Sequence, residues 1–225
     1  MISIKWGFGV VGVLALVGIL WWLFNPTTTV TNYPGEGTTI IAFGDSLIEG
    51  VGASVGNDLP NLLSIGIGKP IENMGVPGDT TNDGLARIDA VIAKDPKLVI
   101  VLLGGNDYLK RIPIDDTFQN LETIIDRIHE SGAMVLLLGI QGGILGDPFK
   151  ERFAALAALK GVAYVPNVLS GVIGNASLMD DAVHPNNAGY AAIAAKILQL
   201  ANINVAFAIF LSKEVEDIAY YAENE

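Results

Sequence analysis

Residues 98–107 read Leu-Val-Ile-Val-Leu-Leu-Gly-Gly-Asn-Asp, an apolar run that stops at two glycines and a polar pair. An apolar run without alternation is typical of a strand that is covered on both of its faces. A second such run, Thr38–Phe43, stops at Gly44 and is followed by Asp45 and Ser46. Both runs therefore predict strands of a parallel sheet, whose carboxyl ends carry polar groups into a shared crevice.

Strand-like and helix-like segments alternate along the rest of the chain. Three more segments are predicted as strands, the last of them the weakest: Met134–Ile140, residues around Val162–Val165, and Pro70–Asn73. Apolar residues at helical spacing or Ala-rich composition predict four helices: Thr81–Lys94, Thr117–Glu130, Pro148–Leu159 and Asn187–Leu200. This alternation with short connections predicts an α/β fold, a three-layer α/β/α sandwich around a parallel sheet.

The composition excludes several kinds of function. The 225 residues suffice for one domain with a substantial core. The formal net charge of -11 disfavours nucleic-acid binding, which needs clustered Lys and Arg. The chain has no cysteine and two histidines, which excludes disulfides, thiolate catalysis and a zinc site, although acidic residues could bind Mg²⁺ or Ca²⁺ weakly.

The N-terminal part of the chain is strongly apolar. Residues 6–24 contain no charged side chain and would span roughly 29 Å as a helix, close to the thickness of a hydrocarbon core. Lys5 before this stretch and Trp21 and Trp22 at its end match the flanks of a transmembrane helix. We expect a membrane anchor within residues 1–25, with the rest of the chain on the extracytoplasmic (periplasmic or extracellular) side. A cleaved signal peptide, hence secretion, and a buried helix are the alternatives.

Three further segments follow the N-terminal stretch. Residues 26–37 are rich in Thr, Pro and Gly and are predicted to be a linker. Residues 38–200 hold all the predicted strands and helices and form the expected domain. Residues 201–225 form a tail with an apolar part, 205–211, that is too short to span a bilayer, and an acidic end. This tail either packs on the domain or binds a protein partner that the sequence does not identify.

Ser46 is the candidate nucleophile, because it directly follows the first predicted strand. A serine hydroxyl needs a base, and the base needs a group that orients it. His184 lies in a polar turn three residues after Asp181, so this carboxylate could fix the imidazole tautomer while the other ring nitrogen faces the serine. Asp180 is adjacent, but its spacing is less suitable, and His129 on a predicted amphipathic helix is interpreted as a packing residue.

Oxyanion stabilisation is the third requirement for acyl transfer. The candidate donors are the backbone N–H groups of Ser46 and Gly75 and the side-chain amide of Asn106. Each motif alone is also compatible with an ordinary turn or helix cap. Position 48 is Ile, so the Gly-x-Ser-x-Gly turn of the α/β-hydrolases is absent.

Four short blocks occur in an informative order: Gly44-Asp45-Ser46-Leu47, Asn73-Met74-Gly75, Gly104-Gly105-Asn106-Asp107 and Asp181-Ala182-Val183-His184. Together they resemble the SGNH (GDSL) hydrolase superfamily, over about residues 38–200. The resemblance implies that Ser46, Gly75, Asn106 and His184 are the four residues for which the superfamily is named, with Asp181 completing a Ser-His-Asp triad. It also implies a flavodoxin-like sandwich with a five-stranded parallel sheet and no cofactor.

A second stretch is similar to one branch of that superfamily. Gly78-Asp79-Thr80-Thr81 followed by Gly84-Leu85-Ala86-Arg87-Ile88 resembles the bacterial acyl-CoA thioesterase, lysophospholipase and arylesterase enzymes. The resemblance implies a serine esterase or thioesterase that hydrolyses lysophospholipids, acyl thioesters, or aryl or alkyl esters through an acyl-enzyme. The loop 141–147 is expected to border the acyl pocket. The alternatives are a carbohydrate O-acetyl esterase of the cell envelope and a non-catalytic, membrane-tethered binding module.

Overall fold

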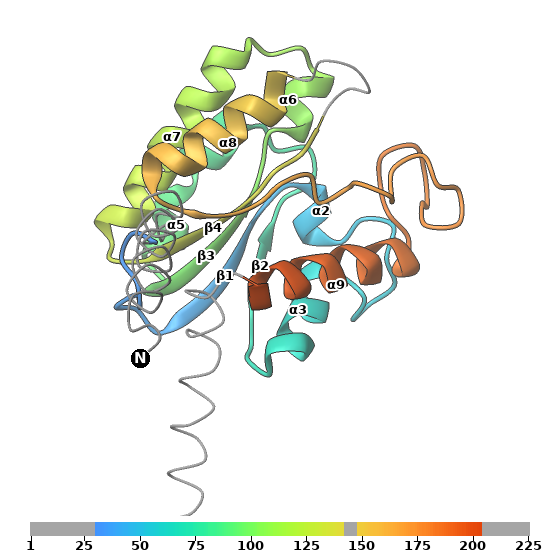
Figure 1. Ribbon diagram of the computed structural model, residues 1–225, viewed down its shortest axis with the longest axis horizontal. Helices are drawn as coiled ribbons and strands as arrows, with labels where there is room; N and C mark the ends of the chain where they lie inside the picture. Colours follow the sequence, from blue (N-terminus) through green and yellow to red (C-terminus); the bar gives the residue numbers. More distant parts are fainter. Residues whose placement is uncertain (1–29, 142–147, 204–225) are drawn as a thin grey trace, which may run out of the picture.

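The computed structural model describes residues 30–141 and 148–203. Within these ranges the chain forms a five-stranded, all-parallel sheet in the order β2-β1-β3-β4-β5 (Figure 1). The strands are β1 (Thr39–Gly44), β2 (Glu72–Gly75), β3 (Pro96–Leu102), β4 (Met134–Leu138) and β5 (Ala163–Val165). The α/β class and the five-stranded parallel sheet therefore agree with the sequence-based expectation, with strand ends shifted by one or two residues.

Helices cover both faces of the sheet (Figure 1). One face packs against α3 (Leu59–Ile67) and α9 (Asn187–Ile203), and the other packs against α4 (Thr81–Ala86), α5 (Ile88–Ile92), α7 (Ile114–Glu130) and α8 (Pro148–Lys160). Two short helices, α2 (Ser46–Glu49) and α6 (Gly105–Leu109), begin close to the carboxyl ends of β1 and β3. These two helices start at the motifs that the sequence analysis singled out.

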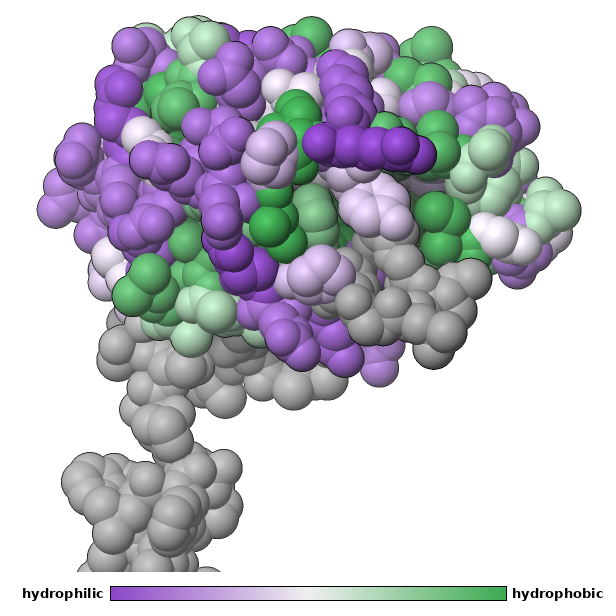
Figure 2. All heavy atoms as spheres, turned by 90° about the horizontal axis from the view of Figure 1, so that it is seen from above, coloured by the Kyte–Doolittle hydropathy of each residue, from purple (hydrophilic) through white to green (hydrophobic). Residues whose placement is uncertain are grey.

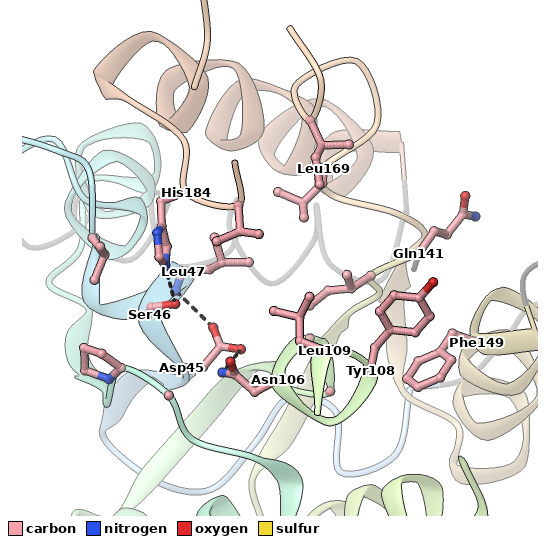
Figure 3. A pocket seen from close by; sticks show the side chains of 18 residues that line it. Asp45, Ser46, Leu47, Asn106, Tyr108, Leu109, Gln141, Phe149, Leu169 and His184 are labelled. Carbon is pink, nitrogen blue, oxygen red and sulfur yellow. Dashed lines mark hydrogen bonds between the residues drawn. The ribbon is translucent and has the colours of Figure 1, made fainter. Parts of the chain in front are cut away.

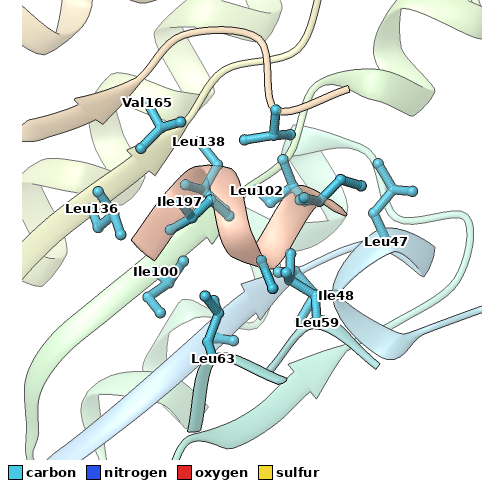
Figure 4. Close-up of a cluster of buried hydrophobic side chains, with 14 of the residues drawn as sticks. Leu47, Ile48, Leu59, Leu63, Ile100, Leu102, Leu136, Leu138, Val165 and Ile197 are labelled. Carbon is cyan, nitrogen blue, oxygen red and sulfur yellow. The ribbon is translucent and has the colours of Figure 1, made fainter. Parts of the chain in front are cut away.

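Most residues of the central strands are apolar because these strands separate two cores. In β3, Leu98, Ile100 and Leu102 face the core beneath α3 and α9. Figure 4 shows Ile100 and Leu102 in this core. Val99 and Val101 alternate with them and face the core beneath α7 and α8. Alternating side chains of a strand point to opposite faces, so a strand buried on both sides has no polar positions.

Helix α7 shows why the outer layer is amphipathic. Its inward positions Leu121, Ile124, Ile125 and Ile128 are fully buried. Its acidic side chains form ion pairs on the outside, where Lys160 of α8 contacts Glu122 and Asp126. Seen from above, the face over these helices carries many hydrophilic residues with apolar residues interspersed (Figure 2).

Two details of the helices differ from the prediction. The expected helix Thr81–Lys94 is divided into α4 and α5, because Arg87 between them has non-helical dihedral angles, φ -115° and ψ 11°. Helix α3 was not predicted, since it is short and contains Pro60 and Gly66. The Asp58 side chain caps this helix by accepting a hydrogen bond from the backbone N–H of Asn61 at 3.0 Å.

The expected N-terminal transmembrane helix is not supported, and the fold is described without it. In the ranges that the structure describes, no helix is both long and apolar enough to cross a bilayer. The longest helices there, α7 and α9, have 17 residues each, and a span needs about 20 predominantly apolar residues. Residues 6–24, on which the expectation was based, lie outside the described residues, as does the tail from residue 204.

Candidate active site

Ser46 is the first residue of α2, at the carboxyl edge of the sheet. Strand β1 ends at Gly44, and Asp45 then caps the helix, its Oδ1 atom accepting a hydrogen bond from Leu47 N–H at 3.0 Å. The backbone N–H groups in the first turn of a helix have no partner inside that helix. The chain therefore presents the Ser46 hydroxyl and its backbone N–H at the carboxyl end of β1.

His184 and Asp181 come from the loop between β5 and α9 and meet Ser46 there (Figure 3). The His184 Nε2 atom lies 3.1 Å from Ser46 Oγ, and His184 Nδ1 lies 2.7 Å from Asp181 Oδ2. The other oxygen of this carboxylate accepts hydrogen bonds from the backbone N–H groups of Val183 and His184, at 2.8 and 2.7 Å. The three side chains form a continuous hydrogen-bonded chain.

The carboxylate of Asp181 is held in its charged form. The hydrogen bond from the His184 ring and those from the two backbone N–H groups lower the pKa of Asp181 to about 2. An ionised Asp181 can only accept, so in neutral His184 the proton sits on Nδ1. The lone pair on Nε2 is then directed at the Ser46 hydroxyl.

Asp45 lies directly below this chain of residues and is almost fully buried. Asp45 is 2% exposed, and burial raises the pKa of its carboxyl group to about 6. The Leu47 N–H and the nearby His184 oppose this rise, whereas Asp79 and Asp107 add to it. Its capping role is compatible with the sequence motif, but its burial depends on the surrounding elements and was not predicted.

Asn106 reaches the site from the first turn of α6. Gly104 before it adopts φ 110°, a left-handed conformation that favours glycine, and so lets the chain turn sharply from β3 into the helix. The Asn106 Nδ2 atom donates one hydrogen bond to the backbone oxygen of Asp79 at 2.9 Å. Its second N–H lies near Asp45 Oδ2, at the long distance of 3.4 Å. The amide is therefore fixed in orientation, with one donor held weakly.

Gly75 is placed differently from the expectation. Its backbone N–H donates to Asn73 Oδ1 at 2.9 Å, and Gly75 is not among the residues that line the cavity beside Ser46. A side chain here would collide with α2, since a Cβ atom would lie 2.1 Å from the backbone nitrogen of Glu49. The structure thus explains this glycine by close packing, and its oxyanion role stays a prediction.

Asp107, next to Asn106, holds α6 in place. Its buried carboxylate accepts hydrogen bonds from the backbone N–H of Thr81 at 2.9 Å and from the hydroxyl of Thr117 at 3.3 Å. These bonds join α6 to the starts of α4 and α7. No feature of the sequence by itself had indicated this role for Asp107.

A cavity of about 410 Å³ opens beside Ser46. Figure 3 shows the polar groups of Ser46, His184 and Asn106 at one side of it and Leu109, Tyr108, Phe149 and Leu169 at the other. Gln141 lies at the far end, where its Oε1 atom accepts a hydrogen bond from Asn167 Nδ2 at 2.9 Å. Of the loop expected to border an acyl pocket, Gln141 lines this cavity, and residues 142–147 lie outside the described residues.

Comparisons with known proteins identify the family of this chain. The model of the GDSL-like Lipase/Acylhydrolase family matches residues 42–192. This chain belongs to that family. Esterase TesA of Pseudomonas aeruginosa is 35% identical over 159 residues, 65% of this chain and 79% of its own. The thioesterase 1/protease 1/lysophospholipase L1 of Escherichia coli is 32% identical over 157 residues, 66% and 76% of the two chains.

A solved structure of the family agrees with this membership. The crystal structure of TesA is 31% identical in sequence and has a TM-score of 0.69, covering 74% of this chain and 99% of its own. These likenesses place the chain in the thioesterase, lysophospholipase and arylesterase branch of the SGNH hydrolases. The chain is therefore an ester hydrolase of the SGNH type.

Other residues that could carry chemistry lie apart from this GDSL-type site. His129 is half-buried on α7, burial lowers its pKa, and its backbone oxygen accepts a hydrogen bond from Asn32 at 2.7 Å. In residues 30–141 and 148–203 no three His, Asp or Glu side chains are grouped as a metal site would require. Arg87 and Asp79 lie beneath the site, and no role was predicted for them. Their only signal in the sequence was that both belong to the stretch that resembles one branch of the superfamily.

Proposed function

We propose that this GDSL-type hydrolase cleaves esters and thioesters of apolar acyl groups through an acyl-enzyme on Ser46. The observation that carries the proposal is the 3.1 Å separation between His184 Nε2 and Ser46 Oγ at the mouth of an apolar cavity. This separation is within the hydrogen-bonding reach that a nucleophile and its general base need.

The mechanism follows from the protonation states. Ser46 Oγ bonds to the substrate carbonyl carbon while its proton passes to His184 Nε2, and Asp181 stabilises the resulting imidazolium. When the carbonyl re-forms, the bond to the leaving alcohol or thiol breaks, and that group takes the proton from Nε2. Water then gives its proton to Nε2 and attacks the acyl carbon, which releases the acid and restores the Ser46 hydroxyl.

The negative oxygen of the tetrahedral intermediate needs donors next to Ser46. We assign this role to the backbone N–H of Ser46 and to the Asn106 N–H that now points towards Asp45 at 3.4 Å. A hydrogen bond from this N–H to the negatively charged oxygen of the intermediate would be stronger than its long contact with Asp45. The N–H can therefore turn to the substrate oxygen when the intermediate forms. Gly75 N–H is a third candidate, provided that it exchanges or shares its bond to Asn73.

The cavity supports an acyl chain rather than a small polar acyl donor. Most of its lining is apolar, and a site with few polar groups favours apolar ligands. The ring of Phe149 packs edge-on against Tyr108 with centroids 5.6 Å apart, which gives one wall a firm aromatic surface. These features favour aliphatic or aryl acyl esters over acetylated carbohydrates, whose hydroxyl groups would meet few partners.

The test is hydrolysis of p-nitrophenyl esters of increasing acyl length, of an acyl-CoA and of a lysophospholipid by the full chain. We expect activity on butyrate and longer esters to exceed activity on acetate, and Ser46→Ala to abolish turnover of every substrate. Ser170→Ala, an exposed serine on the neighbouring loop, is the matched control and should keep full activity. Turnover retained in Ser46→Ala would remove this residue as the nucleophile.

Labelling with a fluorophosphonate probe separates an enzyme from a binding module. The probe should react with the wild type and with Ser170→Ala, and substrate should compete with it. Ser46→Ala should remain unlabelled. A wild type that binds esters but neither turns them over nor reacts with the probe would contradict the proposal.

A further inference from the structure

We propose that Arg87 is a positioning residue for ester hydrolysis, because its guanidinium holds together the three segments that carry the two assigned oxyanion donors and the third candidate, Gly75. The proposal rests on the function proposed above. Arg87 is not among the residues that line the cavity, so it acts on the donors and does not contact the substrate.

Two bonds of Arg87 fix the ends of the two strands. Its Nη2 atom donates to the backbone oxygen of Gly44 at 2.8 Å, two residues before Ser46. Its Nη1 atom donates to the backbone oxygen of Met74 at 2.9 Å, directly before Gly75. A planar guanidinium presents these donors at fixed relative directions, so the two strand ends are held in one geometry.

A third bond connects Arg87 to Asn106. The Nε atom of Arg87 donates to Asp79 Oδ2 at 2.6 Å, and the backbone oxygen of Asp79 accepts the hydrogen bond from Asn106 at 2.9 Å. The segment that fixes the Asn106 amide is therefore held by the same guanidinium. The two assigned donors and the third candidate, Gly75 N–H, are therefore all linked to the side chain of Arg87 through hydrogen bonds and short stretches of backbone.

The local structure places Arg87 for this role. Its side chain is 22% exposed, that of Asp79 is 12% exposed, and the guanidinium carbon lies 4.3 Å from the centroid of the Phe43 ring. The non-helical backbone at Arg87, which interrupts a pattern predicted as one helix, lies between α4 and α5. Loss of the guanidinium would leave two backbone oxygens and a carboxylate near the core without these partners.

The experiment measures kcat and KM on a p-nitrophenyl ester for full-length Arg87→Lys and Arg87→Ala. Lysine keeps the charge next to Asp79 but cannot make three bonds in fixed directions. We expect kcat to fall roughly 100-fold in Arg87→Lys while KM stays nearly constant, as for loss of an oxyanion donor. Added guanidinium at a non-denaturing concentration should restore part of kcat in Arg87→Ala and none in Arg87→Lys.

Two measurements separate positioning from general stability. Affinity for an alkyl boronic acid, which forms a tetrahedral adduct with serine, should fall in parallel with kcat, while affinity for the product carboxylic acid stays unchanged. The matched control is Arg127→Met, which removes an arginine ion pair with Asp89 between α7 and α5, away from the strand ends. This variant should keep wild-type kcat.

The possible outcomes are distinct. A folded Arg87→Lys variant with wild-type kcat, or one in which boronic acid and product affinities fall equally, overturns the proposal. Equal losses of kcat in Arg87→Lys and Arg127→Met also overturn it, because they indicate a general structural effect. A wild type without esterase activity overturns the proposed function itself and, with it, this inference.

Discussion

The Nε2 atom of His184 lies 3.1 Å from the Oγ atom of Ser46, although 138 positions separate the two residues in the sequence. Ser46 follows strand β1, and His184 lies in the loop that precedes α9. A parallel sheet places the carboxyl ends of its strands at one edge, and this arrangement makes the contact possible.

Asp181→Asn should lower kcat by about 10³- to 10⁴-fold, because an asparagine can donate to Nδ1 and so favours the wrong tautomer of His184. Stability should change little at neutral pH, since Asp181 is half-exposed. The lowered pKa means that the carboxylate stays ionised until pH falls towards about 2. The charged Asp181 therefore orients His184 at every pH of the assay. The measurement is kcat/KM at pH 7 with an unfolding curve.

Asp180→Asn is the matched control for Asp181. The carboxylate of Asp180 makes no bond to the His184 ring among the described contacts. The activity of Asp180→Asn should therefore remain within a few-fold of wild type. A larger loss in Asp180→Asn than in Asp181→Asn would reassign the third member of the triad.

Asn106→Ala should lower kcat by about 10²- to 10³-fold with a small change in KM, because the amide acts on charge that develops in the transition state. Steady-state kinetics on a p-nitrophenyl ester test this split. Asn187→Ala, which removes a side chain bonded to Ser54 on the surface, serves as the control and should leave kcat unchanged. A change confined to KM would remove Asn106 from the oxyanion role.

The Asp45→Asn variant should gain stability relative to the wild type as pH rises. Burial raises the pKa of Asp45 from 3.8 to about 6, so the folded state binds this proton more tightly than the unfolded state. The ionised carboxylate therefore costs stability above pH 6, and that cost disappears below pH 4. The difference in unfolding free energy, variant minus wild type, should rise by up to about 3 kcal/mol between pH 4 and pH 8.

Urea unfolding at pH 4, 6 and 8 provides this measurement. The asparagine oxygen can still cap α2 by accepting from Leu47, so the variant keeps the helix cap. Only the slope of the difference therefore reports the Asp45 titration. A constant difference across this range would show that Asp45 is not buried as described.

Gly75→Ala should destabilise the protein by about 1–3 kcal/mol, as expected when a methyl group is forced into a packed contact. The added Cβ would lie 2.1 Å from Glu49 N, so β2 and α2 would have to separate. Gly105→Ala is the control, since its Cβ would meet its nearest neighbours at 3.4 and 3.6 Å. Chemical denaturation compares the two variants, and equal stabilities would contradict the described contact between β2 and α2.

Much of the scaffold was predictable because its signals are local. Apolar runs mark strands buried on both faces, and the 3.6-residue period of α7 follows from a single buried side. The positions of Ser46 and Asn106 after strands were also readable, since glycine and polar residues end an apolar run. The transmembrane helix was the expectation that had to be corrected, because hydropathy alone assigned a segment that the described structure does not support.

The tertiary structure decided the properties that depend on neighbours remote in the chain. The burial of Asp45, the close packing of Gly75 against α2, and the bonds of Arg87 to Gly44 and Met74 each arise from contacts between different elements. No periodicity encodes such contacts, because they form only when strands and loops are packed. The residue types and their order came from the sequence by itself. Which groups meet, and in which protonation state, was determined by packing.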